Sequence, residues 1–416
     1  MPAPAPIPRG PTVLTLYTAA DLLTGPGCPA CRYAGEAADR YLGWFALEAH
    51  ADAVTITRLC SSLGMCPPHT RGLMRQPGAA HRLTAVYRYV MGAARDRLDG
   101  HAGPVAACPA CLHDRDAVRR ALDTLLEGLA DDWVRSRYRE LGGLCIPHLG
   151  AASARADRRS VAWLSRAQAA AIAARPAWPR WLAGTDHDAD VRAVLRRTAA
   201  ADGRPGPGSC IACLAAARSA DDHLAQILRS GGSGPPDSRL LLCAAHLGDA
   251  AVTAGHRDLL PLLAWQVGCL AAAVSPGSAS SPLRTRGGPA GRIWPRRRGD
   301  RSGACPACLA SRDAAQRAVD DLRASLRASH PAALRHPPLC VRHLLGLRAR
   351  DPRAGQLTAR GAVERADKLI TELSEAFGKY TWARRHDARG PEMTAWRRAA
   401  AFLDGGVFCG CPPLDA

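Results

Sequence analysis

The chain has 416 residues, which at roughly 150 residues per domain suggests two or three domains. Hydrophobic residues make up 47% of it and aromatic residues only 5%, so we expect a core of small side chains that bury little area each. The net charge of +18 comes almost entirely from arginine and permits binding to nucleic acid without requiring it. No run of about 18 uncharged apolar residues exists, which excludes a membrane-spanning helix.

Residues 1–16 form a Pro-rich N-terminal tail in this interpretation. The tail lacks the basic segment and following apolar stretch of a secretory signal. We therefore expect a cytoplasmic protein, in which thiols stay reduced. In that compartment sixteen cysteines favour metal ligands over disulfides.

A Cys-x2-Cys pair occurs four times, and each copy is followed about 30 to 35 residues later by a Cys-x2-His pair. Four complete copies exclude a chance pattern. We predict the sixteen residues of these pairs as metal ligands. In the order of the four copies they are Cys28, Cys31, Cys66 and His69; Cys108, Cys111, Cys145 and His148; Cys210, Cys213, Cys243 and His246; and Cys305, Cys308, Cys340 and His343.

Apolar residues follow each Cys-x2-Cys at the spacing of a helix. In the first copy they are Ala38, Leu42 and Phe45, and the other copies have apolar residues at the same offsets of 7, 11 and 14. The pattern predicts a helix of about 20 residues from each Cys-x2-Cys, then a turn with a short helix or loop, and a further helix from each Cys-x2-His. The predicted fold is all-α, with four helical repeats each organised around one Cys3His metal site.

Gly- and Pro-rich stretches divide the chain into two halves. Residues 17–200 would hold repeats one and two, 201–209 a linker, and 210–416 repeats three and four. Residues 275–303 are rich in Ser, Gly, Pro and Arg and predict a flexible basic linker within the second half. The similar segments 194–203 and 395–405 indicate that a two-repeat domain was duplicated.

Three cysteines and one histidine in two closely spaced pairs are typical of a structural zinc site. We therefore predict four Zn²⁺ ions, each of which would contribute an apparent ~10–16 kcal/mol of folding free energy. Such a site is closed, which argues against catalysis at the metal, and we find no phosphate-binding or dinucleotide-binding glycine motif. Two alternatives stay open: an iron–sulfur cluster, or redox-active Cys-x2-Cys dithiols.

Four cysteines fall outside the repeat. Cys60 fits a structural thiol better than an extra ligand, and Cys269 lies in an apolar run that predicts a core position. Cys409 and Cys411 stand two residues apart near the C-terminus, where they could bind a metal or form a strained disulfide.

Three functions fit these observations. The first is a non-enzymatic zinc-binding module that binds or scaffolds an unidentified protein partner. The second is a nucleic-acid-binding regulator, because the arginines around Trp294 in the basic linker could contact phosphates. The third is a redox protein or sensor that uses iron–sulfur clusters or the dithiols.

The motif Cys-Pro-Ala-Cys with a downstream Leu-Cys-x2-His resembles a family of uncharacterised bacterial proteins that carry paired CPxC and CxxH motifs. The ending at residues 395–405 is also similar to the C-terminal part of that family. The resemblance covers most of the chain, once per half, and implies metal ligands but no activity. The third copy departs from it, with Ile211 in place of proline and Ala244 and Ala245 between the ligands.

Overall fold

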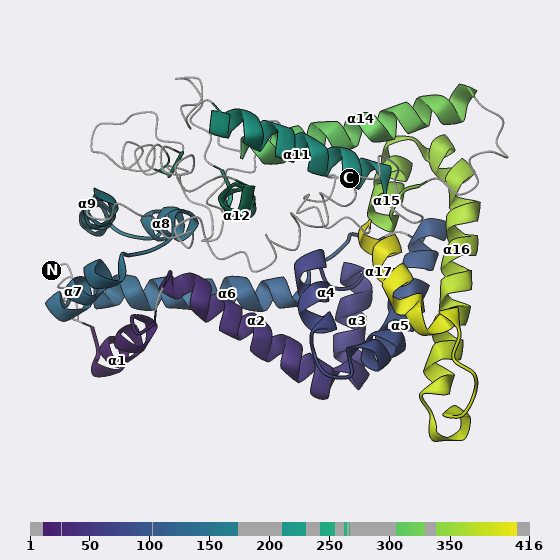
Figure 1. Cartoon of the computed structure of the whole chain (residues 1–416), viewed down its shortest axis with the longest axis horizontal. Helices are drawn as coiled ribbons and strands as arrows, with labels where there is room; N and C mark the ends of the chain where they lie inside the picture. Colours follow the sequence, from purple (N-terminus) through teal and green to yellow (C-terminus); the bar gives the residue numbers. More distant parts are fainter. Residues whose placement is uncertain are drawn as a thin grey trace, which may run out of the picture. The chain divides into compact units, whose positions relative to one another are not determined.

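The computed structural model describes residues 11–25, 27–101, 103–173, 210–229, 242–253, 262, 263, 266, 305–328 and 338–405. Within these ranges every regular element is a helix, so the predicted all-α class is confirmed (Figure 1). The helices are α1 (Val13–Leu22), α2 (Pro29–Leu47), η1 (Ala49–Ala51), α3 (Ala53–Ser62), α4 (Pro67–Met74), α5 (Ala79–Asp99), α6 (Pro109–Gly128), α7 (Asp132–Leu141), α8 (Ile146–Ser153), α9 (Arg158–Ala173), α11 (Ile211–Arg229), α12 (Ala244–Thr253), α14 (Pro306–Ala328), α15 (Val341–Arg350), α16 (Pro352–Lys379), η4 (Trp382–Arg384), η5 (Pro391–Thr394) and α17 (Ala395–Asp404).

The helices expected at the Cys-x2-Cys pairs are α2, α6, α11 and α14, which are 19 to 23 residues long. Ten of the twelve apolar positions that predicted them are buried, and Val118 and Ile227 are half-buried. In α2, for example, Ala38, Leu42 and Phe45 are all buried. The helices expected at the Cys-x2-His pairs are α4, α8, α12 and α15. Hydrophobic periodicity therefore located both kinds of helix correctly.

Helix α1 begins inside the segment predicted as a tail. The side chain of Thr12 caps it by accepting a hydrogen bond from the Thr15 backbone N–H at 3.1 Å. Residues 13–16 are therefore helical, which corrects the predicted tail boundary. The predicted linkers at 201–209 and 275–303, and the segment 194–203, lie outside the described residues.

The chain divides into two compact units. Unit 1 comprises Met1–Glu36, Asp114–His187 and Leu224–Pro306, and unit 2 comprises Ala37–His113, Asp188–His223 and Ala307–Ala416. Each unit takes segments from both predicted halves of the chain. The duplication of a two-repeat domain stays a prediction.

Unit 1 contains α1, α7, α8, α9 and α12 as whole helices. The chain enters α7 through Asp131, whose carboxylate accepts hydrogen bonds from the backbone N–H groups of Trp133 and Val134. On its buried side α7 presents Tyr138, whose ring lies 5.5 Å from that of Trp163 on α9. These contacts hold the loop that leads into α8.

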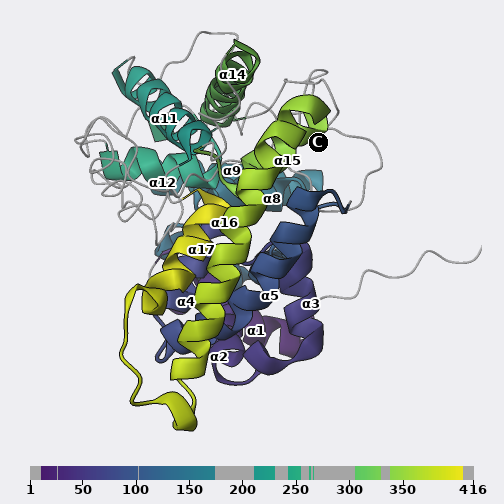
Figure 2. The same ribbon diagram turned by 90° about the vertical axis from the view of Figure 1, so that its right-hand side faces the viewer.

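Unit 2 is built on α5 and α16, which pack along each other and against α17 (Figure 2). Their contact is lined by buried side chains that include Met91 and Ala94 on α5 and Ala366 and Leu373 on α16. Small side chains allow two helices to pack closely, as the Ala-rich composition predicts. Among all the described helices, none combines the length and the apolar character needed to cross a membrane.

Candidate metal centres

The structure gathers all sixteen predicted ligands into four groups, each of which could hold one metal ion. Within a group the ligand atoms all lie within 4.8 Å of one another. The groups are site A (Cys28, Cys31, Cys145 and His148), site B (Cys66, His69, Cys108 and Cys111), site C (Cys210, Cys213, Cys340 and His343) and site D (Cys243, His246, Cys305 and Cys308).

The two pairs of a site come from different copies of the repeat. The first Cys-x2-Cys meets the second Cys-x2-His at site A, and the first Cys-x2-His meets the second Cys-x2-Cys at site B. In the same way, site C combines the third Cys-x2-Cys with the fourth Cys-x2-His, and site D combines the third Cys-x2-His with the fourth Cys-x2-Cys. This corrects the expectation that the four ligands of one copy surround one ion.

Helix length explains the exchange. From Cys28 the 19 residues of α2 carry the chain about 29 Å away. Helix α3, the next α-helix along the chain, has 10 residues and spans only about 15 Å, too short to return Cys66 to Cys28. The 20 residues of α6 and the 10 of α7 then lead to Cys145, which does reach Cys28 and Cys31.

Every ligand pair lies at the N-terminus of a helix. The first cysteine of each Cys-x2-Cys directly precedes its helix, and Cys66, Cys145 and Cys340 are N-caps with extended backbone. Two helix N-termini therefore face each site. Their N–H groups and partial positive charge stabilise thiolates, the form in which cysteine binds metals.

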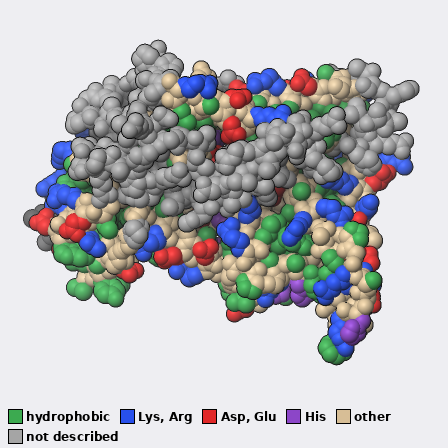
Figure 3. All heavy atoms as spheres, viewed as in Figure 1, with side chains coloured by type: hydrophobic (Ala, Val, Ile, Leu, Met, Phe, Trp, Pro, Cys, Tyr) green, Lys and Arg blue, Asp and Glu red, His purple; other side chains and the backbone are tan. Residues whose placement is uncertain are grey.

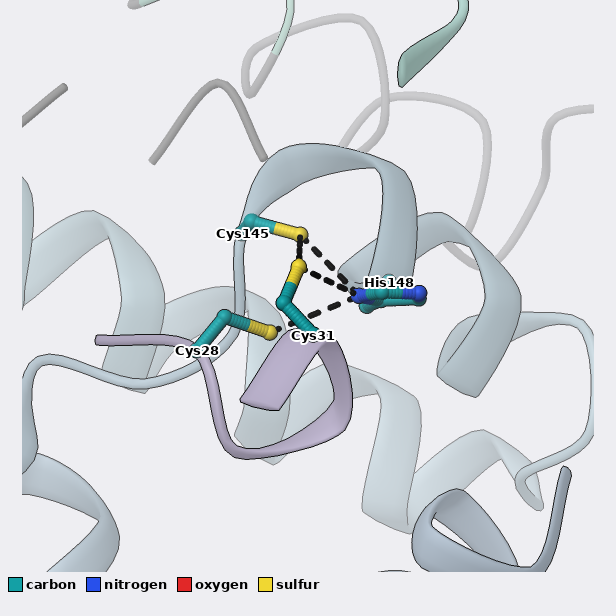
Figure 4. Close-up of side chains that lie close together, drawn as sticks. All are labelled: Cys28, Cys31, Cys145 and His148. Atoms are coloured by element: carbon teal, nitrogen blue, oxygen red, sulfur yellow. Dashed lines mark hydrogen bonds between the residues drawn. The ribbon is translucent and has the colours of Figure 1, made fainter. Parts of the chain in front are cut away.

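Site A illustrates the geometry (Figure 4). Helix α2 carries Cys31 and is directly preceded by Cys28, whereas Cys145 and His148 come from the start of α8. The Nδ1 atom of His148 lies 3.2 Å from the sulfurs of Cys31 and Cys145 and 3.4 Å from that of Cys28. The sulfurs of Cys31 and Cys145 are 3.6 Å apart. All four ligand atoms thus converge on one small volume.

Sites B, C and D repeat this arrangement with histidine Nδ1 as the inward nitrogen. At site B the Cys66 sulfur lies 3.1 Å from His69 Nδ1 and 3.5 Å from the Cys111 sulfur. At site C the Cys340 sulfur is 3.1 Å from His343 Nδ1. At site D, His246 Nδ1 lies 3.2 Å from the Cys243 sulfur and 3.4 Å from the Cys305 sulfur.

The close packing of site A shifts the proton affinity of its ligands. Hydrogen bonds with Cys145, Cys28 and His148 lower the pKa of the Cys31 thiol, whereas burial and the neighbouring sulfurs raise the pKa of Cys145. Burial opposes a charge on His148, but hydrogen bonds with Cys28 and Cys31 raise its pKa to about 10. A divalent cation would replace the protons that these side chains share, so metal binding is expected to release protons.

A buried polar network holds the turn that leads into Cys145. The backbone N–H of Leu144 donates to Gln168 Oε1 and to the Tyr138 hydroxyl, both at 3.2 Å. Gln168 Nε2 donates in turn to the Gly142 carbonyl at 3.2 Å. Gly142 and Gly143 both have positive φ, a conformation that glycine adopts at little cost. The network thereby sets the direction from which Cys145 enters site A.

The end of α17 performs a similar role at site C. The backbone N–H of Cys210 donates to the Gly405 carbonyl at 3.2 Å, and the Asp404 carbonyl lies 3.8 Å from the Cys213 sulfur. The Asp404 carboxylate is paired at 3.1 Å with Arg342, a residue between the two ligands of α15. Site C is therefore supported by residues close to the C-terminus.

Sequence reasoning did not identify these supporting residues. The sequence feature that could have indicated the tight turn at site A is the pair of glycines before Leu144. Leu63 and Gly64 take the corresponding place before the Cys-x2-His of site B, and both also have positive φ. Cys60 belongs to none of the four groups; it is half-buried against the core, and burial raises the pKa of its thiol. Cys269, Cys409 and Cys411 lie outside the described residues.

The structure arranges the CPxC and CxxH pairs into the four sites, and the resemblance to a bacterial family stays a prediction. No family model, curated protein or solved structure matches the chain.

Proposed function

We propose that this chain is a zinc-binding helical protein in which four structural ions hold the helices together, and that it acts as a non-enzymatic binding or scaffolding module. The observation that carries the proposal is the set of four compact Cys3His groups. Because each group already supplies four ligands, a tetrahedral zinc ion there would have no open position for a substrate.

The sulfur separations support a single ion at sites A, B and C. Two ligands bound about 2.3 Å from one tetrahedral ion lie about 3.8 Å from each other. The pairs Cys31–Cys145, Cys66–Cys111 and Cys213–Cys340 are 3.6, 3.5 and 4.0 Å apart. Ligands on different irons of an iron–sulfur cluster stand further apart, because iron and sulfide lie between them. The mixed thiolate and imidazole donor set is typical of structural zinc.

A structural role also fits the surroundings of the ligands. The sulfur-bearing residues of site C and those of site A are all buried, which limits access to substrates. Three thiolates on Zn²⁺ carry one net negative charge, and the two helix N-termini at each site compensate it. A core rich in alanine gains less from burial than one rich in large side chains, so the ions would supply stability that the core lacks.

The binding role draws support from α1, where Val13, Leu14 and Tyr17 are 85%, 73% and 76% exposed. Apolar side chains on adjacent turns that face solvent fit a protein partner. A photo-crosslinking amino acid at position 14, compared with one at the exposed Glu48, tests this role. A discrete adduct at position 14 alone would support it, and equal labelling at both positions would count against it.

Elemental analysis of the freshly purified, tag-free protein, with its visible spectrum, tests the metal. We expect about four zinc ions per chain and a colourless protein. Iron with acid-labile sulfide would overturn the zinc assignment and make a redox function the leading one. Absence of any bound metal would leave the Cys-x2-Cys pairs as reactive thiols.

A further inference from the structure

The loop that joins α16 to η5, residues 381–390, is exposed at every position. In Figure 1 it extends beyond the ends of α16 and α17 as the yellow loop at the lower right. It contains three arginines, one histidine and one tryptophan but a single carboxylate, so its net charge is about +2. We call this segment the Trp382 loop.

Buried groups hold the base of the Trp382 loop. Lys379 Nζ donates to the Ala388 carbonyl at 2.6 Å and to Glu392 Oε1 at 2.8 Å. Glu392 Oε1 also accepts from the Gly390 N–H at 2.7 Å. The Lys379 ammonium and the Gly390 N–H lower the pKa of Glu392 to about 2, so the pair is ionised at neutral pH.

The Lys379–Glu392 pair is only 8% exposed on each side chain, so both charges are desolvated. The attraction between two buried charges offsets the free energy of removing them from water only when their geometry is good. The better attested effect of a buried ion pair is that it defines one conformation. Here the pair fixes both ends of an exposed loop. The loop is thereby ordered before any ligand binds, which reduces the entropy lost on binding.

Trp382 is the only large apolar side chain of the loop and is 78% exposed. The Arg385 guanidinium carbon lies 3.2 Å from the centroid of its ring, and Arg385 Nη1 donates to the Trp382 carbonyl at 2.8 Å. The guanidinium covers one face of the indole. Because the side chain is so exposed, the opposite face meets solvent and can accept a flat ligand.

Cationic groups surround the indole. Asp387 pairs with Arg384 at 2.7 Å, so the net positive charge of the loop corresponds to Arg385 and Arg389. Figure 3 shows basic, histidine and hydrophobic atoms together at the lower right, where the loop ends. An aromatic face beside positive charge is the combination by which proteins hold single-stranded nucleic acid.

We infer that the Trp382 loop binds single-stranded nucleic acid, with one base stacked on the open face of Trp382 and neighbouring phosphates held by Arg385 and Arg389. A duplex keeps its bases stacked on each other and offers none to the indole. Insertion of Trp382 into an anionic membrane would also remove the stacked Arg385 guanidinium from water, and the transfer of a charged group into an apolar medium is unfavourable. The inference uses no metal ligand, so zinc content and oligonucleotide binding test the two proposals separately.

The test uses the full chain as purified, with whatever metal it holds, and a fluorescein-labelled twelve-nucleotide thymidine strand; binding is followed by fluorescence anisotropy. Trp382→Ala should weaken binding about 5- to 150-fold, the range for loss of one stacked base. Trp382→Phe should retain most of the affinity. Trp133→Ala is the matched control, because Trp133 is also exposed, at 56%, and lies on α7. It should bind like the wild type.

The salt dependence separates stacking from charge. Arg389→Gln should reduce the slope of log affinity against log salt by about 0.7, the value for one phosphate of a single strand. Trp382→Ala should leave that slope unchanged. The inference is overturned if the wild type binds no single strand, if Trp382→Ala binds as well as Trp133→Ala, or if a duplex competes equally. Trp382-dependent binding to vesicles with 30% phosphatidylserine, without oligonucleotide binding, would assign the loop to membranes instead.

Discussion

The exchange of ligand pairs between copies makes a prediction that two double variants decide. Cys31 and Cys145 share site A, although 114 residues separate them, and their sulfurs lie 3.6 Å apart. Cys66 follows Cys31 in the same copy of the repeat but belongs to site B. Cys31→Ser with Cys145→Ser therefore damages one site, and Cys31→Ser with Cys66→Ser damages two.

The expected zinc content follows directly. From four sites, the Cys31/Cys145 double variant should keep about three zinc ions and the Cys31/Cys66 double variant about two. Stability should follow the same rule. Most of the stability that a site contributes is lost with its first ligand, because three ligands hold the ion far less tightly than four. The second substitution within site A should therefore add little, whereas substitutions in separate sites should add nearly in full.

Plasma mass spectrometry of the purified variants measures the zinc content, and urea unfolding measures the stability. Replacement of zinc by cobalt adds a spectroscopic count, because thiolate–cobalt bands report each surviving site. If the Cys31/Cys145 variant lost two ions and the Cys31/Cys66 variant only one, each copy would hold its own ion. The helix-length argument would then be refuted.

Three further predictions concern residues that support the sites and the core. Gly405→Ala should destabilise site C by at least about 1 kcal/mol and speed zinc release to a chelator, because Gly405 has a φ of +94° and a Cβ would lie 2.5 Å from the Cys213 sulfur. Gln168→Ala should cost about 1–3 kcal/mol in urea unfolding, because the buried Leu144 N–H loses one of its two hydrogen-bond acceptors and Gln168 also serves a carbonyl. Burial, followed by the charge of Arg82, lowers the pKa of His50 below its usual 6.5, so the folded protein binds fewer protons there than the unfolded chain. The stability contributed by neutral His50 should therefore be present above about pH 6.5 and be lost as the pH falls, and His50→Gln should flatten this dependence in thermal unfolding.

Matched changes separate these effects from general damage. Gly43→Ala within α2, where a Cβ would meet nothing within 4 Å, should stabilise the protein by about 0.5–1 kcal/mol. Gln76→Ala, outside the core, should change the stability by less than about 0.5 kcal/mol. Equal zinc release by the two glycine variants, or equal stability of the two glutamine variants, would contradict the roles assigned above. Identical pH dependence with and without His50 would contradict the third prediction.

Local patterns predicted the parts of this protein that depend on neighbouring residues. Apolar offsets located α2, α6, α11 and α14, and the apolar residue before each Cys-x2-His pair, such as Leu144 or Leu339, is buried. In three of the four copies a proline follows the first cysteine, and its fixed φ suits the first helical position. The motif spacing also identified all sixteen residues that the structure gathers into the four sites.

Tertiary structure alone decided which ligands meet. A spacing of about 30 to 35 residues favours closure within one copy, because a short loop costs less entropy. That argument treats the chain as flexible, but the α2 helix is a rod of about 29 Å. Supporting residues such as Gln168 and Gly405 could not be predicted either, because tertiary packing brings them to their sites and no regular sequence spacing marks them. The sequence by itself determined what each ligand is, and the rigid helices decided which ligands share an ion.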